Sequence, residues 1–215
     1  MIANEVSKLL LQINAVTFRF DPPFTYTTGL KSPIYLDNRI VMSYPKVREK
    51  IVDFYIQKIK KKIKLKNVDW IAGTATAAIP HASFIASELK LPMVYVRPTT
   101  KSYGKGNQVE GYIKKNSNVL IVEDHISTAS SITETARALR AEGGVVKYCI
   151  ATTTYETPMS KDNVKKSKLK LIALTTGKNI VETALRQKYI TVDQKKIVDD
   201  WLADPKGWGK RHGFV

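Results

Sequence analysis

The feature that most constrains this fold is a regular alternation of short apolar runs with segments of helical periodicity. Four runs are rich in β-branched residues, as in strands buried on both faces: 68–73 (VDWIAG), 92–97 (PMVYVR), 118–124 (NVLIVED) and 145–155 (VVKYCIATTTY). Between them, 80–90 and 130–143 have a helical period, and Gly143-Gly144 stops the second helix. The alternation predicts an α/β fold, a parallel sheet flanked by helices that binds ligands outside the carboxyl ends of its strands.

The two ends of the chain depart from this alternation. Residues 19–39 mix aromatic residues, prolines and glycine, which indicates a loop-rich cap with short strands. Long amphipathic helices are predicted over 44–62 and from the N-cap signal Thr191 to Asp204-Pro205. No repeat or linker is visible, so we predict a single domain over 1–215: an N-terminal part at about 15–45, a core at about 46–175 and a C-terminal helical extension at about 176–215.

Charge and cysteine content limit the class of protein. A net charge of +16 favours anionic partners, which are nucleic acid, a membrane surface or phosphorylated small molecules. Much of this charge lies in lysine-rich stretches such as 58–66 and 165–170, which are typical of solvated helix faces, so nucleic acid is the less favoured partner. The single cysteine, Cys149, excludes an internal disulfide and a multi-cysteine metal site, and we expect it buried on a strand in a cytoplasmic protein. No apolar run approaches the roughly 20 residues of a membrane helix, so no membrane association is expected.

The segment 119–131 (VLIVEDHISTASS) carries the most chemical information. An apolar strand ends on two adjacent acids, Glu123 and Asp124, and five small residues then lead into a helix. Backbone N–H groups of such a turn and of the helix N-terminus can bind a phosphate monoester. The acids could hold vicinal ribose hydroxyls or act on the charge that develops as a glycosidic bond breaks. The alternative is a strand–turn–helix junction without a ligand, which the paired acids and the run of small residues disfavour.

Two further segments suit the same kind of ligand. Residues 94–113 leave a strand at Arg97 and form a long polar, glycine-punctuated stretch with Lys101 and Lys105. This composition is typical of a mobile lid that brings cations to a diphosphate, although a solvated surface loop is the alternative. Residues 73–82 (GTATAAIPHA) form a small-residue turn that permits close backbone approach to diphosphate oxygens.

These segments resemble a known family. Residues 119–131 resemble the 5-phosphoribosyl-1-diphosphate (PRPP) motif of type I phosphoribosyltransferases. The spacing of Arg97, Lys101 and Glu110-Gly111 resembles the catalytic loop of orotate phosphoribosyltransferases, and 24–39 (FTYTTGLKSPIYLDNR) resembles the N-terminal hood of that family, which helps to enclose the base. The resemblance implies a type I phosphoribosyltransferase fold with a hood, and transfer of ribose 5-phosphate from PRPP to orotate.

The resemblance also implies site residues, a cofactor and an assembly. It assigns catalytic roles to Lys101, Glu123 and Asp124, and orotate contacts to Ser127, Lys31 and Tyr35. The implied PRPP-binding set is Thr74, Ala75, Arg97, Lys101, Tyr103, Glu123, Asp124, His125, Ile126, Ser127, Thr128, Ala129, Ser130 and Ser131. Mg²⁺ would be held mainly by PRPP and not by protein side chains alone. The implied homodimer has shared active sites, each completed by the neighbour's Lys101 loop.

The chain departs from the family pattern at several positions. Ala129 and Ser130 stand where glycines are common, and a non-glycine residue in a left-handed conformation there costs about 1–2 kcal/mol. Tyr103 replaces a histidine, and Pro98 replaces a lysine that often follows the loop arginine. Tyr155 stands near a position where some members carry an arginine that contacts the base. Two alternatives share the PRPP site, a purine phosphoribosyltransferase and a PRPP-responsive nucleic-acid-binding regulator.

Overall fold

A computed structural model describes residues 2–26, 28–98 and 108–214. Its centre is a six-stranded sheet in the order β10-β9-β8-β5-β6-β7. The strands are β5 (Trp70–Thr74), β6 (Met93–Val96), β7 (Val109–Glu110), β8 (Asn118–Ile126), β9 (Val145–Thr154) and β10 (Lys170–Thr176). All neighbouring pairs are parallel except β6 and β7, which are antiparallel. The predicted α/β class and the four predicted strands are confirmed.

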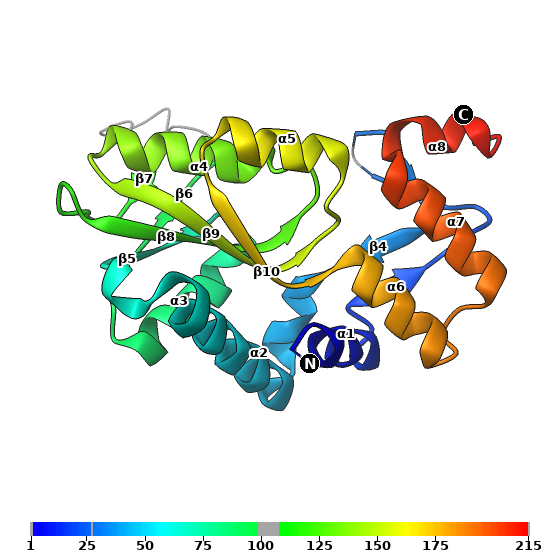
Figure 1. Cartoon of the computed structure of the whole chain (residues 1–215), viewed down its shortest axis with the longest axis horizontal. Coiled ribbons are helices and arrows are strands. Elements are labelled where there is room, and N and C mark those ends of the chain that lie inside the picture. Colours follow the sequence, from blue (N-terminus) through cyan, green and yellow to red (C-terminus); the bar gives the residue numbers. More distant parts are fainter. Residues whose placement is uncertain (1, 27, 99–107, 215) are drawn as a thin grey trace.

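Helices cover both faces of the sheet, as Figure 1 shows. On one face lie α4 (Ser130–Ala141) and α5 (Pro158–Lys166), and on the other α1 (Ile2–Gln12), α2 (Pro45–Lys58) and α3 (Ala78–Leu89). Along β8, Leu120 and Val122 pack with the core beneath α2 and α3, whereas Ile121 packs beneath α4. Because both faces are covered, these strands are apolar throughout and do not alternate with polar residues. Cys149 on β9 is fully buried, as expected.

The hood (residues 15–45) is built from two small antiparallel pairs. Strand β1 (Val16–Phe18) pairs with β4 (Ile34–Leu36), and β2 (Phe24–Thr25) pairs with β3 (Lys31–Ser32). A 3₁₀ helix, η1 (Asn38–Ser43), then leads into α2, which continues through the π-helical turn η2 (Ile59–Ile63) and the 3₁₀ turn η3 (Leu65–Asn67).

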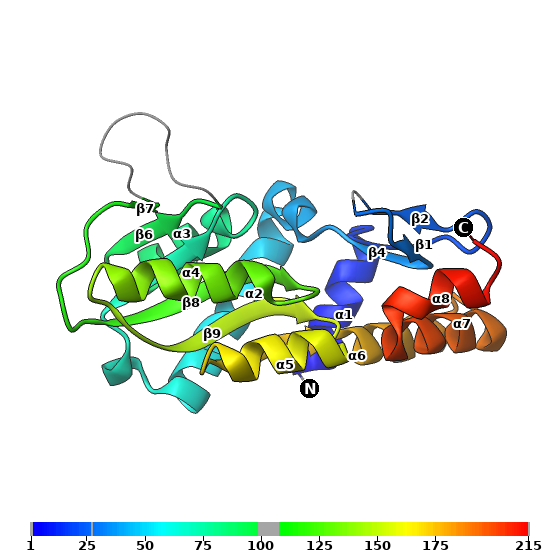
Figure 2. The same cartoon turned by 90° about the horizontal axis from the view of Figure 1, so that it is seen from above.

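The C-terminal extension is helical and lies against the hood, as Figure 2 shows from above. It consists of α6 (Gly177–Arg186), α7 (Val192–Ala203) and α8 (Pro205–Arg211). Thr191 caps α7 in a reciprocal capping box with Gln194, which confirms the N-cap signal. Among the described residues, no helix has the length and apolar character to span a bilayer.

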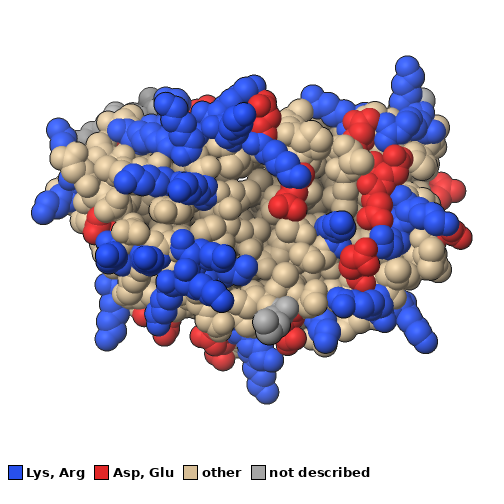
Figure 3. Space-filling model, in the orientation of Figure 1, with Lys and Arg blue, Asp and Glu red and all other residues tan. Residues whose placement is uncertain are grey.

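Lysine and arginine side chains form several separate clusters on the face drawn in Figure 3. Acidic side chains lie among them, mainly on the side of the C-terminal helices. Some of the lysines are paired on their own helix, as Lys166 is with Asp162 at 2.7 Å. On this face, the distribution of charge fits solvated helix faces better than one continuous basic groove.

Candidate active site

The two adjacent acids at the carboxyl end of β8 occupy different environments. Glu123 is only 5% exposed, and its Oε1 accepts a hydrogen bond from the Asp124 N–H at 3.0 Å. Burial, with the nearby charge of Asp124 as a second cause, raises the pKa of the Glu123 carboxyl well above its ordinary value. Asp124 is half-buried and lies near the carboxyl end of β8. The pair therefore places one carboxyl inside the protein, where burial raises its pKa, and a second one next to solvent.

Two side chains from distant elements hold the backbone of this acidic pair. Asn38 of η1 donates its Nδ2 hydrogens to the Asp124 carbonyl oxygen and to Thr153 Oγ1, both at 2.7 Å. Tyr55 of α2 donates its hydroxyl to the Glu123 carbonyl oxygen at 3.0 Å. Neither Asn38 nor Tyr55 was predicted from the sequence to belong to the site. Asn38 lies inside the hood segment and could have been noticed there, but nothing in the sequence around Tyr55 distinguishes it from a core residue.

The turn from β8 to α4 leaves backbone donors available for an anion. The N-cap of α4 is Ala129, whose side chain cannot cap the first turn. The Ser130 N–H makes one long hydrogen bond of 3.4 Å to Thr128 Oγ1. The carbonyl oxygens of Ser127 and Thr128 are held from below by Thr157 Oγ1 at 3.2 Å and Asn163 Nδ2 at 2.8 Å. The helix dipole and these N–H groups make the turn suitable for a phosphate.

Ala129 has the left-handed backbone that the missing glycines of this loop would favour, with φ of 65° and ψ of 14°. We predict that Ala129→Gly raises the free energy of unfolding by about 0.5–1 kcal/mol, because relief of the left-handed strain exceeds the entropy that glycine adds to the unfolded chain. Ala138→Gly is the matched control: Ala138 is also 5% exposed but lies inside α4, where glycine costs about 1 kcal/mol. Urea unfolding measures both, and equal destabilisation by the two changes would contradict the prediction.

A cavity of about 210 Å³ adjoins this turn on the side of β5 and β6. Its wall includes five residues of the predicted PRPP-binding set, which are Thr74, Ala75, Arg97, Ser130 and Ser131. The other lining residues are Val96, Pro98, Gln108, Glu134 and Thr135. The peptide bond from Ala75 to Thr76 is cis. Arg97 contributes a cation, 3.4 Å from Glu110 Oε1. The cavity combines hydroxyls, backbone groups, one guanidinium and the carboxyl of Glu134, and of these the hydroxyls, the backbone groups and the guanidinium suit a diphosphate.

The predicted catalytic loop lies mostly outside the described residues. This holds for Lys101, Tyr103 and Lys105. Its two ends are described, and they are joined by hydrogen bonds of 2.9 Å from the Arg97 N–H to the Gln108 carbonyl and from Gln108 Nε2 to the Arg97 carbonyl. The loop therefore starts and finishes at the edge of the 210 Å³ cavity.

A larger cavity of about 670 Å³ lies on the other side of the turn, under the hood. Its walls are the hood turn (Thr28, Gly29, Leu30), the β8–α4 turn (Ser127, Thr128), the start of α5 (Thr157, Pro158, Met159) and the α7–α8 junction (Ala203, Asp204, Pro205, Lys206). Of the predicted base contacts, Ser127 lines this cavity. Lys31 and Tyr35 lie nearby in the hood but not on its wall, and Tyr35 packs against Phe24 and Tyr26.

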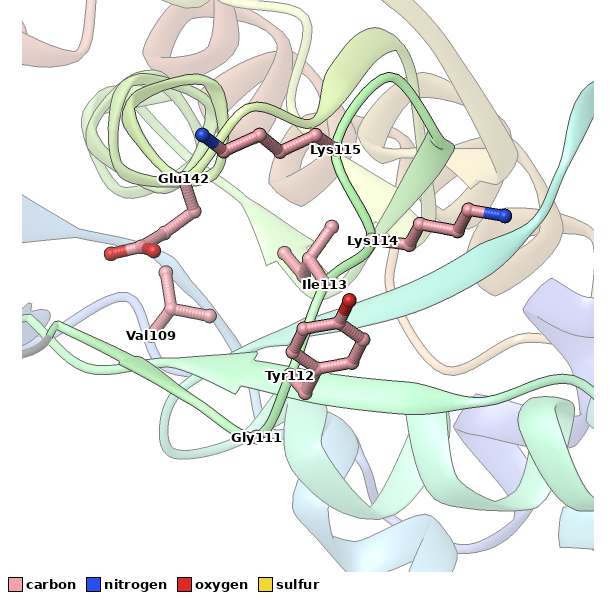
Figure 4. Close-up of a pocket in the computed structure, with 7 residues that line it drawn as sticks. All are labelled: Val109, Gly111, Tyr112, Ile113, Lys114, Lys115 and Glu142. Atoms are coloured by element: carbon pink, nitrogen blue, oxygen red, sulfur yellow. The ribbon is translucent and has the colours of Figure 1, made fainter.

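A third hollow, of about 550 Å³, lies away from these residues and is drawn in Figure 4. It is formed by the segment after β7 and the end of α4, and is lined by Val109, Gly111, Tyr112, Ile113, Lys114, Lys115 and Glu142. None of these was predicted as a site residue, and the hollow lacks the paired acids and the uncapped helix that characterise the sheet edge.

His125 follows the acidic pair, and its ring contacts Thr153 and Tyr155. Its Nδ1 lies 2.8 Å from Thr153 Oγ1, and its ring meets the Tyr155 ring edge-on at 4.4 Å. Burial lowers the pKa of His125 to about 4, so the ring is neutral at physiological pH.

This environment predicts a pH-dependent contribution to stability. The pKa of His125 rises to about 6.5 on unfolding, so the unfolded chain binds the extra proton. The contribution is fully present above about pH 6.5 and is lost as the pH falls towards 4. We expect wild type to lose about 1–2 kcal/mol more than His125→Leu between about pH 7.5 and pH 5, measured by urea unfolding. Parallel pH profiles of the two proteins would show that His125 does not contribute.

The sheet topology, the uncapped α4 turn beside Asp124 and the adjoining cavity define a phosphoribosyltransferase domain, and the family model of the phosphoribosyl transferase domain matches residues 45–188. The orotate phosphoribosyltransferase of Enterococcus faecalis is 43% identical over 209 residues, which cover 97% of this chain and 99% of that protein. That of Coxiella burnetii is 43% identical over 206 residues, covering 96% and 98%. The chain belongs to the orotate phosphoribosyltransferase family.

Solved structures agree with this assignment. The orotate phosphoribosyltransferase of Aeropyrum pernix superposes with a TM-score of 0.74 at 25% identity, covering 86% of this chain and 99% of that one. The UMP synthase of Leishmania donovani gives a TM-score of 0.78 at 27% identity, covering 93% of this chain and 42% of that longer one.

Proposed function

We propose that this protein transfers ribose 5-phosphate from PRPP to N1 of orotate, giving orotidine 5′-phosphate and diphosphate in the synthesis of UMP. The observation that carries the proposal is at the carboxyl end of β8, where the turn into α4 lies between two cavities. The smaller cavity, with Arg97, suits the diphosphate, and the larger, under the hood, suits the base. Relatives that are 43% identical over almost their whole length carry the name of this activity.

The geometry supports a division of roles within the proposed PRPP site. The turn of Ser127, Thr128, Ala129, Ser130 and Ser131, with His125 and Ile126 supporting it from β8, binds the 5′-phosphate through backbone N–H groups. Asp124, whose backbone is held by Asn38, accepts hydrogen bonds from the ribose hydroxyls. Thr74, Ala75 and Arg97 border the diphosphate.

Catalysis in this proposal is mainly electrostatic and positional. Departure of diphosphate leaves an oxocarbenium-like sugar, and the Asp124 carboxylate lies where it stabilises that positive charge. Arg97 and Lys101 neutralise the leaving diphosphate. Glu123 is buried, and it contributes by accepting the hydrogen bond of the Asp124 N–H through its Oε1.

A magnesium ion fits this arrangement as a companion of PRPP. Mg²⁺ prefers oxygen ligands, and the diphosphate and ribose hydroxyls supply most of them. When bound, the ion would neutralise charge on the leaving group, with Asp124 as the adjacent carboxylate of this chain. We also propose a cytoplasmic homodimer in which each Lys101 loop completes the neighbour's site, and the free, buried thiol of Cys149 suits a reducing compartment.

A base panel tests the proposed function. The protein is incubated with PRPP, Mg²⁺ and orotate, and the loss of orotate absorbance is followed, with adenine, hypoxanthine, guanine and uracil in parallel. We expect orotate alone to be consumed, with one diphosphate released for each orotate. Consumption of a purine would instead identify a purine phosphoribosyltransferase. Salt-sensitive RNA or DNA binding without base-dependent diphosphate release would identify a regulator.

A further inference from the structure

We propose that Trp201, in helix α7, is a positioning residue that holds the hood over the base-binding cavity. It acts through a hydrogen bond to the hood backbone and through its contact with Tyr155. This inference rests on the proposed function, because the effect is expected on the base and not on PRPP.

The outer part of the hood needs support from the rest of the protein. Strands β2 and β3 contain two residues each, and an isolated two-stranded hairpin is at best marginally stable in water. The turn between them supplies Thr28, Gly29 and Leu30 to the wall of the 670 Å³ cavity. The position of this turn, and with it the shape of the cavity, therefore depends on contacts outside the hairpin.

Trp201 makes such a contact at β3. Its side chain is 1% exposed, and its Nε1–H donates a hydrogen bond of 2.8 Å to the carbonyl oxygen of Lys31. The two residues are 170 positions apart in the chain. A hydrogen bond shielded from water is electrostatically stronger than an exposed one, and its loss leaves the Lys31 carbonyl without this donor.

Tyr155 provides a second contact and connects Trp201 to the catalytic strand. Its ring meets the Trp201 ring edge-on at 4.9 Å and the His125 ring at 4.4 Å. Its hydroxyl lies 3.3 Å from the hydroxyl of Tyr26, immediately after β2, and its N–H donates to the Ile126 carbonyl at 3.0 Å. The hood is thus held at Lys31 and at Tyr26, and both contacts lead to the end of β8.

The location of α7 and α8 favours a role in the base site over a role in the PRPP site. The match to the phosphoribosyl transferase domain ends at residue 188, before α7 begins, whereas the orotate phosphoribosyltransferase relatives cover almost the whole chain. The junction of the two helices forms one wall of the hood cavity. Figure 2 shows α7 and α8 beside the hood strands, on the side away from β6 and β7.

Trp201→Phe tests the role of the indole donor, with Trp208→Phe as a matched control. Phenylalanine keeps an aromatic ring against Tyr155 but removes the Nε1–H. Trp208 lies in α8 and is fully buried, and its Nε1 has no hydrogen-bond partner within the described part of the chain, so the same substitution there removes ring area without removing a hydrogen bond seen in the structure. Both proteins are assayed for the KM of orotate, the KM of PRPP and kcat, and their thermal unfolding is compared.

We expect Trp201→Phe to raise the KM of orotate about threefold to tenfold, with the KM of PRPP changed less than about twofold. Trp208→Phe should leave both KM values within about twofold of wild type. Tyr155→Phe, which removes only the hydroxyl that meets Tyr26, should raise the KM of orotate in the same direction, and it carries the test if Trp201→Phe does not fold.

Other outcomes separate this inference from the proposed function. If wild type consumes orotate but Trp201→Phe matches Trp208→Phe, the positioning role is wrong and the proposed function stands. An equal rise in both KM values for Trp201→Phe would show a merely structural role and would also overturn it. If wild type does not consume orotate, the proposed function fails and this inference fails with it.

Discussion

Asp124→Asn is expected to lower kcat/KM for PRPP by about 10²–10³-fold, the size of effect seen when one group that stabilises transition-state charge is removed. Asparagine keeps the shape of the side chain but loses the negative charge that faces the developing oxocarbenium-like sugar. The main-chain contact from Asn38 to the Asp124 carbonyl oxygen does not involve the side chain, so the fold around the turn should persist.

Glu123→Gln is the control for this substitution, because it makes the same chemical change one residue earlier. Burial raises the pKa of Glu123 and so disfavours its charged form, and glutamine retains an oxygen that can accept from the Asp124 N–H. We expect this variant to lose less than about tenfold in kcat/KM. Steady-state assays with PRPP and orotate measure both variants. If Glu123→Gln proved as damaging as Asp124→Asn, the assignment of the charge to Asp124 would be wrong.

Lys101→Ala is expected to lower kcat by about 10²–10³-fold while the KM of PRPP changes less than about threefold. The reason is that the lysine is proposed to neutralise the diphosphate as it leaves, an interaction that strengthens in the transition state. Lys114→Ala removes the same charge from an exposed position of the described chain, just after β7, and should leave kcat unchanged. Burst and steady-state kinetics distinguish a slow chemical step from slow product release.

Lys101→Ala and Asp124→Asn together test the proposed shared site. If each loop completes the neighbouring subunit's site, a mixture of Lys101→Ala with Asp124→Asn forms heterodimers with one intact site. Random pairing of equal amounts then restores about a quarter of the wild-type activity. A mixture that stays as inactive as its components would show that Lys101 acts within its own subunit.

Much of the fold could be predicted from local pattern, with a clear exception. Strands β5, β6, β8 and β9 were predicted, at 68–73, 92–97, 118–124 and 145–155, because a strand buried on both faces must be apolar along its whole length. Strand β10 was not singled out, because it lies at the edge of the sheet, follows the lysine-rich stretch and starts on an exposed Lys170. An edge strand tolerates such residues, and only its pairing with β9 reveals it.

The candidate site also has a part that could be located from the sequence and a part that could not. The turn from Ser127 to Ser131 could be located because strand, acids, small residues and helix follow one another along the chain. The groups that hold the acidic pair could not be located, since Asn38 and Tyr55 reach it from 86 and 68 residues away and resemble ordinary polar or core residues in the sequence. The same holds for the contact of Trp201 with Lys31 in the hood, 170 residues apart.

By itself, the sequence determined the fold class, the order of strand, acid pair and phosphate-binding turn, and the family, because each depends on residues that are neighbours along the chain. Only the tertiary structure decided that Glu123 is buried with a raised pKa while Asp124 is half-buried, that Ala129 has a left-handed backbone, and that Trp201 of α7 contacts the hood. The physical reason is that burial, and with it the protonation of an acid, depends on which distant segments pack around a group, and such packing is a property of the whole folded chain.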